Sequence, residues 1–173
     1  MLSLSVLDGS GTLAAAPDLA TVLLDCVARG ASVGFMAPLS RERAEAFWTG
    51  VAEGVARGDR RLIAARVGGE IVGTAQVIFA GPENQPHRAD VAKMLVRGDH
   101  RRRGIGEALM AAAEQAARDA GRTLLVLDTA SDVAERLYAR AGWTRLGVIP
   151  GYALLPHGGL CDTVMFYKRL TAA

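Results

Sequence analysis

An apolar run, a basic glycine-rich turn and a long alanine-rich segment follow one another between residues 89 and 120. The run at 89–96 predicts a strand, the turn at 101–106 carries three arginines and two glycines, and the stretch at 104–120 predicts a helix. Glycines let a backbone approach an anion closely, and the first turn of a helix presents free N–H groups to it. Arginine adds permanent charge in a fork suited to phosphate. The segment therefore predicts a cradle for the pyrophosphate of a nucleotide-like cofactor.

The remaining pattern predicts one α/β domain over residues 1–173, because this length supports one good core but not two. The runs 89–96 and 123–129 flank a helix, so we expect a right-handed βαβ unit with parallel strands. The other strands form hairpins, which predicts a central mixed sheet flanked by helices on both faces. Residues 8–16 read as a loop. The remaining strands are expected at 2–7, 60–67, 71–80, 143–149 and 162–170, and the remaining helices at 17–29, 40–57 and 131–141.

Composition narrows the class of protein. Lys and Arg number 20 against 18 Asp and Glu, a balance that argues against a nucleic-acid or membrane surface. No segment approaches the ~20 apolar residues of a membrane span, and the start lacks the pattern of a signal peptide. Cys26 and Cys161 lie far apart, which favours a reduced, cytoplasmic setting. The three histidines lack metal spacing, so no metal site is predicted; they are His87, His100 and His157.

Two motifs in this order resemble those of the GNAT superfamily of acetyltransferases. The first is Arg-x-x-Gly-x-Gly between a strand and a helix, formed by Arg101, Gly104 and Gly106. The second, on the next predicted helix, consists of Ala134, Tyr138, Gly142 and Trp143. The resemblance covers about residues 60–170 and implies the GNAT fold, acetyl-CoA as cofactor and N-acetyl transfer to an amine.

The resemblance also implies which residues meet the cofactor. In the family a backbone N–H on the strand before the cradle stabilises the oxyanion, where a bulge splays two parallel strands. Leu95 and Val96 match that position, and Leu95 is the predicted donor. Ser131 stands where many relatives have asparagine. The full predicted cofactor set is Met94, Leu95, Val96, Arg101, Arg102, Arg103, Gly104, Ile105, Gly106, Glu107, Ser131, Ala134 and Tyr138.

A narrower resemblance links residues 30–36, 127–129 and 150–152 to the tabtoxin-resistance acetyltransferases, which belong to the same superfamily and acetylate a β-lactam amino-acid toxin. It extends the likeness to the N-terminal helices, which help to shape the acceptor pocket in this fold. By resemblance, the pocket wall would include Ser32, Phe35, Met36 and Tyr152. The substrate itself does not follow from the likeness.

Two other interpretations of the glycine turn are weaker. A dinucleotide-binding turn, Gly-x-Gly-x-x-Gly, needs a third glycine where this chain has Leu109, and it belongs near the first βαβ unit of a domain. A merely solvated basic turn does not require Gly104 and Gly106 at a helix start.

Acetyl transfer needs a base for the amine, a donor for the oxyanion and an acid for the thiolate. Asp90 lies where several relatives carry a catalytic glutamate, while Asp128 ends an apolar run, where a buried carboxylate would need a partner or a ligand. Either could be the base or bind the substrate ammonium. Alternatively, Asp90 is an exposed charge at a strand start and Asp128 a cap for the next helix. Tyr138 is the predicted acid, with a core tyrosine as the alternative.

The predicted function is direct acetyl transfer from acetyl-CoA to the amine of a small molecule, such as a toxin, an antibiotic or an amino-acid-like compound. Two alternatives remain open. One is an acetyltransferase for a protein lysine or N-terminal amine, and the other is a non-catalytic acyl-CoA sensor. Either a monomer or a homodimer formed through the C-terminal strands fits the pattern.

Overall fold

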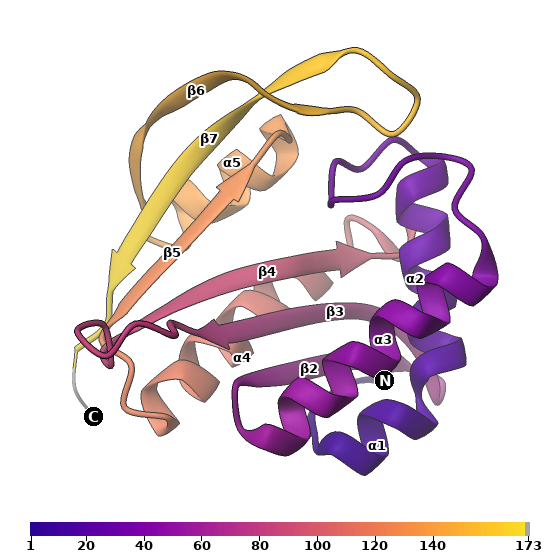
Figure 1. Cartoon of the computed structure of the whole chain (residues 1–173), viewed down its shortest axis with the longest axis horizontal. Coiled ribbons are helices and arrows are strands. Elements are labelled where there is room, and N and C mark those ends of the chain that lie inside the picture. The colour runs from indigo at the N-terminus through magenta and orange to yellow at the C-terminus, as the bar shows by residue number, and fades with distance from the viewer. Residues whose placement is uncertain (172–173) are drawn as a thin grey trace.

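Seven strands form one mixed sheet in the computed structural model, which describes residues 1–171 (Figure 1). The strand order is β1-β2-β3-β4-β5-β7-β6, and only β4 and β5 are parallel neighbours. This confirms the predicted mixed sheet and its parallel βαβ unit. The strands are β1 (Leu2–Leu7), β2 (Arg60–Val67), β3 (Glu70–Phe79), β4 (Arg88–Val96), β5 (Leu124–Thr129), β6 (Thr144–Leu154) and β7 (Leu160–Arg169).

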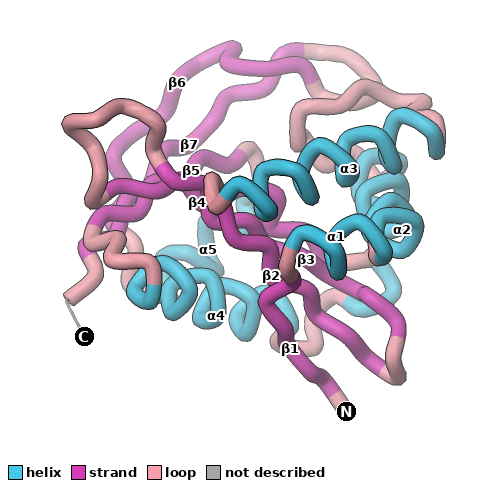
Figure 2. The backbone as a smooth tube through the Cα atoms, turned by 60° about the horizontal axis from the view of Figure 1, so that its bottom comes forward, coloured by secondary structure: helices cyan, strands magenta, loops and turns pink. Residues whose placement is uncertain are grey.

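Helices cover both faces of the sheet (Figure 2). The face that we call the α3 face lies under α1 (Gly9–Ala14), α2 (Ala16–Ala28) and α3 (Arg41–Arg57). The opposite face, called the α4 face, lies under α4 (Ile105–Asp119) and α5 (Asp132–Arg140). Each face has its own core, since alternate residues of a strand point to opposite sides. The fully buried Trp48 of α3 lies in the first core, and Trp143, just before β6, lies in the second.

The strands β4 and β5 pair over only three positions, the last joining Asp90 to Val126. Beyond it the two strands diverge, as Figure 1 shows. A bulge in β4 accompanies the divergence, because Thr74 faces Leu95 while Gln76 faces Ala92, which leaves two residues of β4 opposite one of β3. The sheet is therefore open between the C-terminal halves of β4 and β5.

Two predicted boundaries were wrong. The expected loop at 8–16 contains α1, which Asp8 caps by accepting a hydrogen bond from the Gly11 N–H at 2.6 Å. The strand expected at 143–149 continues to Leu154, because an irregularity after Ile149 carries it past Pro150. There Gly151 has a φ of 60° and donates its N–H to Asp162 at 2.8 Å.

A buried ionic cluster joins α4 to the C-terminal half of the sheet. Glu114, only 6% exposed, accepts hydrogen bonds from Lys168 Nζ at 2.7 and 2.8 Å and from Trp143 Nε1 at 3.0 Å. Lys168 also donates to the carbonyl of Ala141 at the end of α5 at 2.6 Å. Every strong donor and acceptor of the cluster is thus paired, which is the condition for tolerating buried charge.

Candidate active site

The glycine-rich turn leads directly into α4, as predicted. Gly104 is the N-cap residue with a φ of 76°, and no side chain caps the helix. The N–H groups of the first turn therefore have no partner within the helix. A Cβ at Gly106 would lie 3.3 Å from Leu137 Cδ2 of α5, so a side chain there would require Leu137 to shift by a few tenths of an ångström. Arg101, Arg102 and Arg103 are exposed beside the helix start, where their charge adds to the helix dipole.

Other parts of the molecule hold the turn in place. The Asp25 carboxylate of α2 accepts a hydrogen bond from the Gly98 N–H at 2.7 Å. Arg97 and His100 donate to Asp99, and these hydrogen bonds hold the pKa of that carboxyl well below its usual range. Arg101 Nε donates to the Val96 carbonyl at 3.1 Å, so this arginine both shapes the turn and carries charge.

The backbone of β4 corrects the predicted oxyanion donor. Arg97 N–H donates to the Val72 carbonyl at 2.9 Å, and hydrogen-bonded pairs alternate along an antiparallel ladder. The next such pair is Thr74 with Leu95, so the Leu95 N–H is directed at β3 and is not free. The Val96 carbonyl points the other way, toward Arg101, and its N–H shares that direction. The Val96 amide therefore lies on the open side of β4, and the Met94 N–H points away from β3 because the Lys93 carbonyl of the same trans peptide accepts from Thr74.

The two predicted carboxylates lie on the α3 face but differ in environment. Asp90 lies where β4 and β5 are still paired, and Arg88 Nη1 forms an ion pair with it at 2.9 Å. Asp128 lies beyond the last position at which β5 pairs with β4, and it is exposed rather than buried as expected. It accepts a hydrogen bond from the hydroxyl of the buried Thr163 at 2.8 Å. Asp128 does not cap α5, because the Ser131 side chain does so by accepting from the Ala134 N–H.

Tyr138 of α5 lies in the core of the α4 face. Its side chain is 4% exposed and packs edge-to-face on Phe166, with ring centroids 5.6 Å apart. Burial, assisted by the charge of Asp128, raises the pKa of Tyr138 to about 12. The phenol is therefore neutral at ordinary pH and remains able to donate its proton in a hydrogen bond.

Lys93, which sequence reasoning missed, lies in the β4 bulge with a φ of 49°. Positive φ is uncommon outside glycine and is often found at functional sites. The Thr74 hydroxyl donates to the Lys93 carbonyl at 2.9 Å and supports this conformation. Burial lowers the pKa of the Lys93 ammonium, and the charge of Asp128 opposes that effect. No sequence pattern marks a bulge at this lysine.

The segment 30–39 and the β6–β7 turn meet at one end of the sheet opening. The Ala37 N–H donates to the Pro156 carbonyl at 2.9 Å, and the Cys161 thiol lies 3.7 Å from the Ser32 hydroxyl. Phe35 packs on Phe47 of α3, with centroids 5.2 Å apart. The other two residues expected in the pocket wall, Met36 and Tyr152, are exposed.

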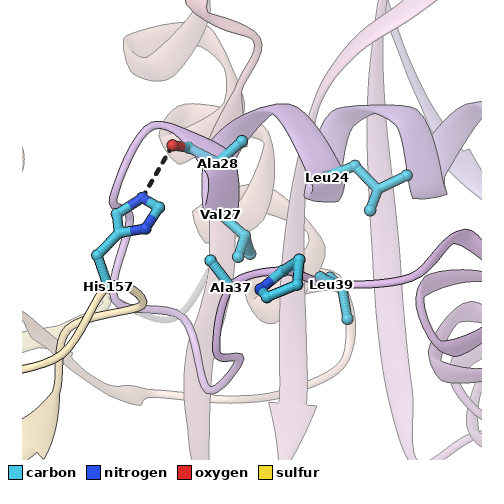
Figure 3. A pocket seen from close by; sticks show the side chains of 7 residues that line it. Leu24, Val27, Ala28, Ala37, Leu39 and His157 are labelled. Atoms are coloured by element: carbon cyan, nitrogen blue, oxygen red, sulfur yellow. Dashed lines mark hydrogen bonds between the residues drawn. The ribbon is translucent and has the colours of Figure 1, made fainter.

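An apolar groove of about 480 Å³ lies behind this contact, along the C-terminal half of α2 (Figure 3). The His157 ring closes one side, with Nε2 3.1 Å from the Ala28 carbonyl oxygen. None of the predicted site residues lines it, so the groove is separate from the charged cluster around Asp128. Within residues 1–171, no group of metal-ligating side chains gathers and no helix is long and apolar enough to cross a membrane.

A family model described as the acetyltransferase (GNAT) family matches residues 30–143. The chain belongs to this family. A curated relative, an uncharacterized N-acetyltransferase of Azospirillum brasilense, is 31% identical in an alignment 147 residues long that covers 75% of this chain and 86% of the relative. The glycine-rich turn, β4, β5 and Tyr138 all lie within the residues that the family model matches.

Solved structures share the GNAT fold at low identity. The YncA protein from Salmonella typhimurium, solved with its cofactor acetyl-CoA, has a TM-score of 0.82 at 15% identity, over 100% of this chain and 96% of that one. A phosphinothricin acetyltransferase from Sinorhizobium meliloti, solved in complex with acetyl-CoA, has a TM-score of 0.79 at 16% identity, over 98% of this chain and 88% of that one.

Proposed function

We propose that this GNAT acetyltransferase transfers the acetyl group of acetyl-CoA to the amine of a small molecule within a ternary complex. The observation that carries the proposal is the opening between β4 and β5, which has the cradle at its end and the charged cluster of Asp128 on the α3 face. This arrangement allows a donor and an acceptor to meet without a covalent enzyme intermediate.

The cradle residues fit a pyrophosphate. The uncapped start of α4 offers the N–H groups of Ile105, Gly106 and Glu107, and the three exposed arginines supply positive charge. Open amides of β4 would bind the pantetheine arm, and Ser131 with Ala134 begins the helix that borders the opening. When bound, acetyl-CoA supplies an activated acetyl group as a thioester.

The chain's own groups then have distinct roles. The Met94 and Val96 amides, rather than that of Leu95, donate to the carbonyl oxygen as negative charge develops there. Asp128 accepts a proton from the acceptor ammonium, directly or through a water, and Tyr138 Oη donates a hydrogen bond to the departing sulfur. Asp90 is the weaker candidate for the base because Arg88 already neutralises it.

A small acceptor is favoured over a protein. The contact between segment 30–39 and the β6–β7 turn closes one end of the opening, which shortens any groove for a polypeptide. The phosphinothricin acetyltransferase among the structural neighbours supports an amino-acid-like acceptor. We infer a role in modifying such a compound, including toxins and antibiotics of that type.

Calorimetric titration with acetyl-CoA, with NAD as the control ligand, tests the proposal first. We expect saturable binding of acetyl-CoA alone, followed by thiol release in a screen of amines that includes β-lactam amino acids. An absence of acetyl-CoA binding would show that the glycine-rich turn is not a pyrophosphate site. Binding without turnover of any small or protein amine would instead favour the acyl-CoA sensor.

Gly106→Val should weaken acetyl-CoA binding by about tenfold or more, since one charge-assisted hydrogen bond contributes ~1.5–3 kcal/mol. The added Cβ would press on Leu137 and disturb the first turn of α4. Gly50→Val, where nothing lies within 4 Å of the Cβ position on α3, is the matched control. Equal Kd values for both variants in calorimetry would show that the turn does not hold the cofactor.

Asp128→Asn should lower kcat/KM about 100-fold, the lower end of the effect of a general base. Asp90→Asn should cost less than about tenfold, because Asp90 is paired with Arg88 outside the open segment. Both substitutions preserve side-chain size, and the two enzymes are compared at saturating acetyl-CoA. The reverse order of effects would assign the base to Asp90.

A further inference from the structure

Lys93 is a half-buried cation without an acidic partner in the part of the chain that the structure describes. No carboxylate of residues 1–171 lies within the 4.0 Å of an ion pair from its Nζ. Instead, Nζ lies 5.6 Å from the ring centroid of Phe47 and 3.9 Å from the Cβ position of Gly34. The other lysine of the chain, Lys168, is fully paired in the Glu114 cluster. Lys93 therefore has unused capacity to bind an anion.

The surrounding structure holds the backbone of Lys93 in its conformation. Its backbone has the uncommon positive φ of the bulge, which Thr74 supports by a hydrogen bond to the carbonyl. The bulge lies at the start of the open segment of β4, and the side chain lies on the α3 face against Phe47. Strained conformations of this kind persist where the surrounding structure holds them.

Further unpaired donors lie on the same face of the neighbouring strands. Gln76, 1% exposed and one position from the bulge on β3, has no partner for Nε2 among the described residues. Arg60 donates to Gln76 Oε1 at 3.2 Å, but its buried Nε has no described partner. Across the opening, Asp128 supplies the acceptor, close enough for its charge to act on Lys93. The α3 face thus has cationic donors on one side and a carboxylate on the other.

We propose that Lys93 binds an acid group of the acceptor, so that the substrate carries a carboxylate or a phosphinate in addition to the amine that faces Asp128. This inference rests on the proposed function and narrows it to zwitterionic, amino-acid-like acceptors. Lys93 is the specificity residue, because a neutral amide in place of the acid would leave the ammonium unpaired.

Matched acceptors test the inference. The probes are α-amino acids and their α-carboxamides, which share the amine and differ only in the acid. Wild-type enzyme should use the acids about 10- to 100-fold better in kcat/KM, the range that a charged hydrogen bond supplies. Lys93→Met should remove this preference by slowing the acids alone, while Lys93→Arg should retain most of it. Arg61→Met, which removes a cation 5.2 Å from the Phe79 ring on the α4 face, should leave the preference unchanged.

A binding measurement separates this inference from the proposed function. Calorimetry with coenzyme A and the same amino acids should show acid binding that Lys93→Met weakens about 10- to 100-fold. Equal use of acids and amides by wild type, or acid binding that is absent or unchanged in Lys93→Met, would overturn the role of Lys93. Failure of the proposed function would appear elsewhere, as loss of acetyl-CoA binding by the wild-type protein.

Discussion

Tyr138→Phe should lower kcat about 100-fold while the Kd of acetyl-CoA changes little. The substitution removes one oxygen and keeps the ring that packs on Phe166, so neither the α4 core nor the cradle is altered. General acids contribute ~10²–10⁴-fold, and we expect the lower end. A phenol with a pKa of about 12 holds its proton more tightly than a thiolate whose thiol has a reference pKa of ~8.5. In the proposed mechanism, Tyr138 therefore stabilises the leaving sulfur chiefly by hydrogen bonding.

The raised pKa also fixes the pH dependence expected of Tyr138. The neutral phenol is the active form, and it persists at every pH below about 12. A rise of kcat/KM with increasing pH then reports deprotonation of the acceptor or of its base. If kcat/KM begins to fall again at a pH lower than ~10, a group other than Tyr138 causes the fall. Tyr167→Phe on β7 provides the same chemical change as a control. Unaltered turnover by Tyr138→Phe would remove Tyr138 from the mechanism and leave it a core residue.

Lys168→Met should lower the free energy of unfolding by about 3–5 kcal/mol, as measured by urea denaturation. The substitution leaves the Glu114 carboxylate buried with Trp143 Nε1 and a longer contact to Arg118, which are too few partners for its charge. The side chains have similar length, so loss of packing contributes little.

Two further variants check the physical cause of that loss. Adding Glu114→Gln to Lys168→Met should recover part of the stability, since it removes the unpaired charge. Arg145→Met breaks the exposed pair with Glu135 at 3.4 Å and should cost no more than about 1 kcal/mol. A Lys168→Met protein as stable as wild type would show that the cluster does not stabilise the fold.

Local chemistry made much of the fold predictable. The glycine turn and the apolar run of β5 each have one dominant physical interpretation, and both lie as expected. The helices expected from residues 40 and 131 also begin there, with Ser40 and Ser131 as their caps. The helix α1 was missed because its sequence is rich in glycine and its only strong signal is the Asp8 cap.

The candidate site was harder to predict because it depends on register. Whether the Leu95 amide is free depends on how β3 and β4 pair, and no residue in β4 announces the bulge at Lys93. Asp128 was expected to be buried in a central strand, but the divergence of β4 exposes it. These features arise from pairing between distant segments, which a local pattern does not contain.

A sheet that was continuously paired would separate the groups on its α3 face from those on its α4 face. Here β4 and β5 pair at only three positions, so the sheet consists of a four-stranded part, β1 to β4, and a three-stranded part, β5 to β7, joined at one end. Asp128 and Tyr138 can then lie on opposite sides of the sheet, while the charge of Asp128 still contributes to the raised pKa of Tyr138. The acceptor can then lose its proton on one side of the sheet while the leaving sulfur receives a hydrogen bond from the opposite side.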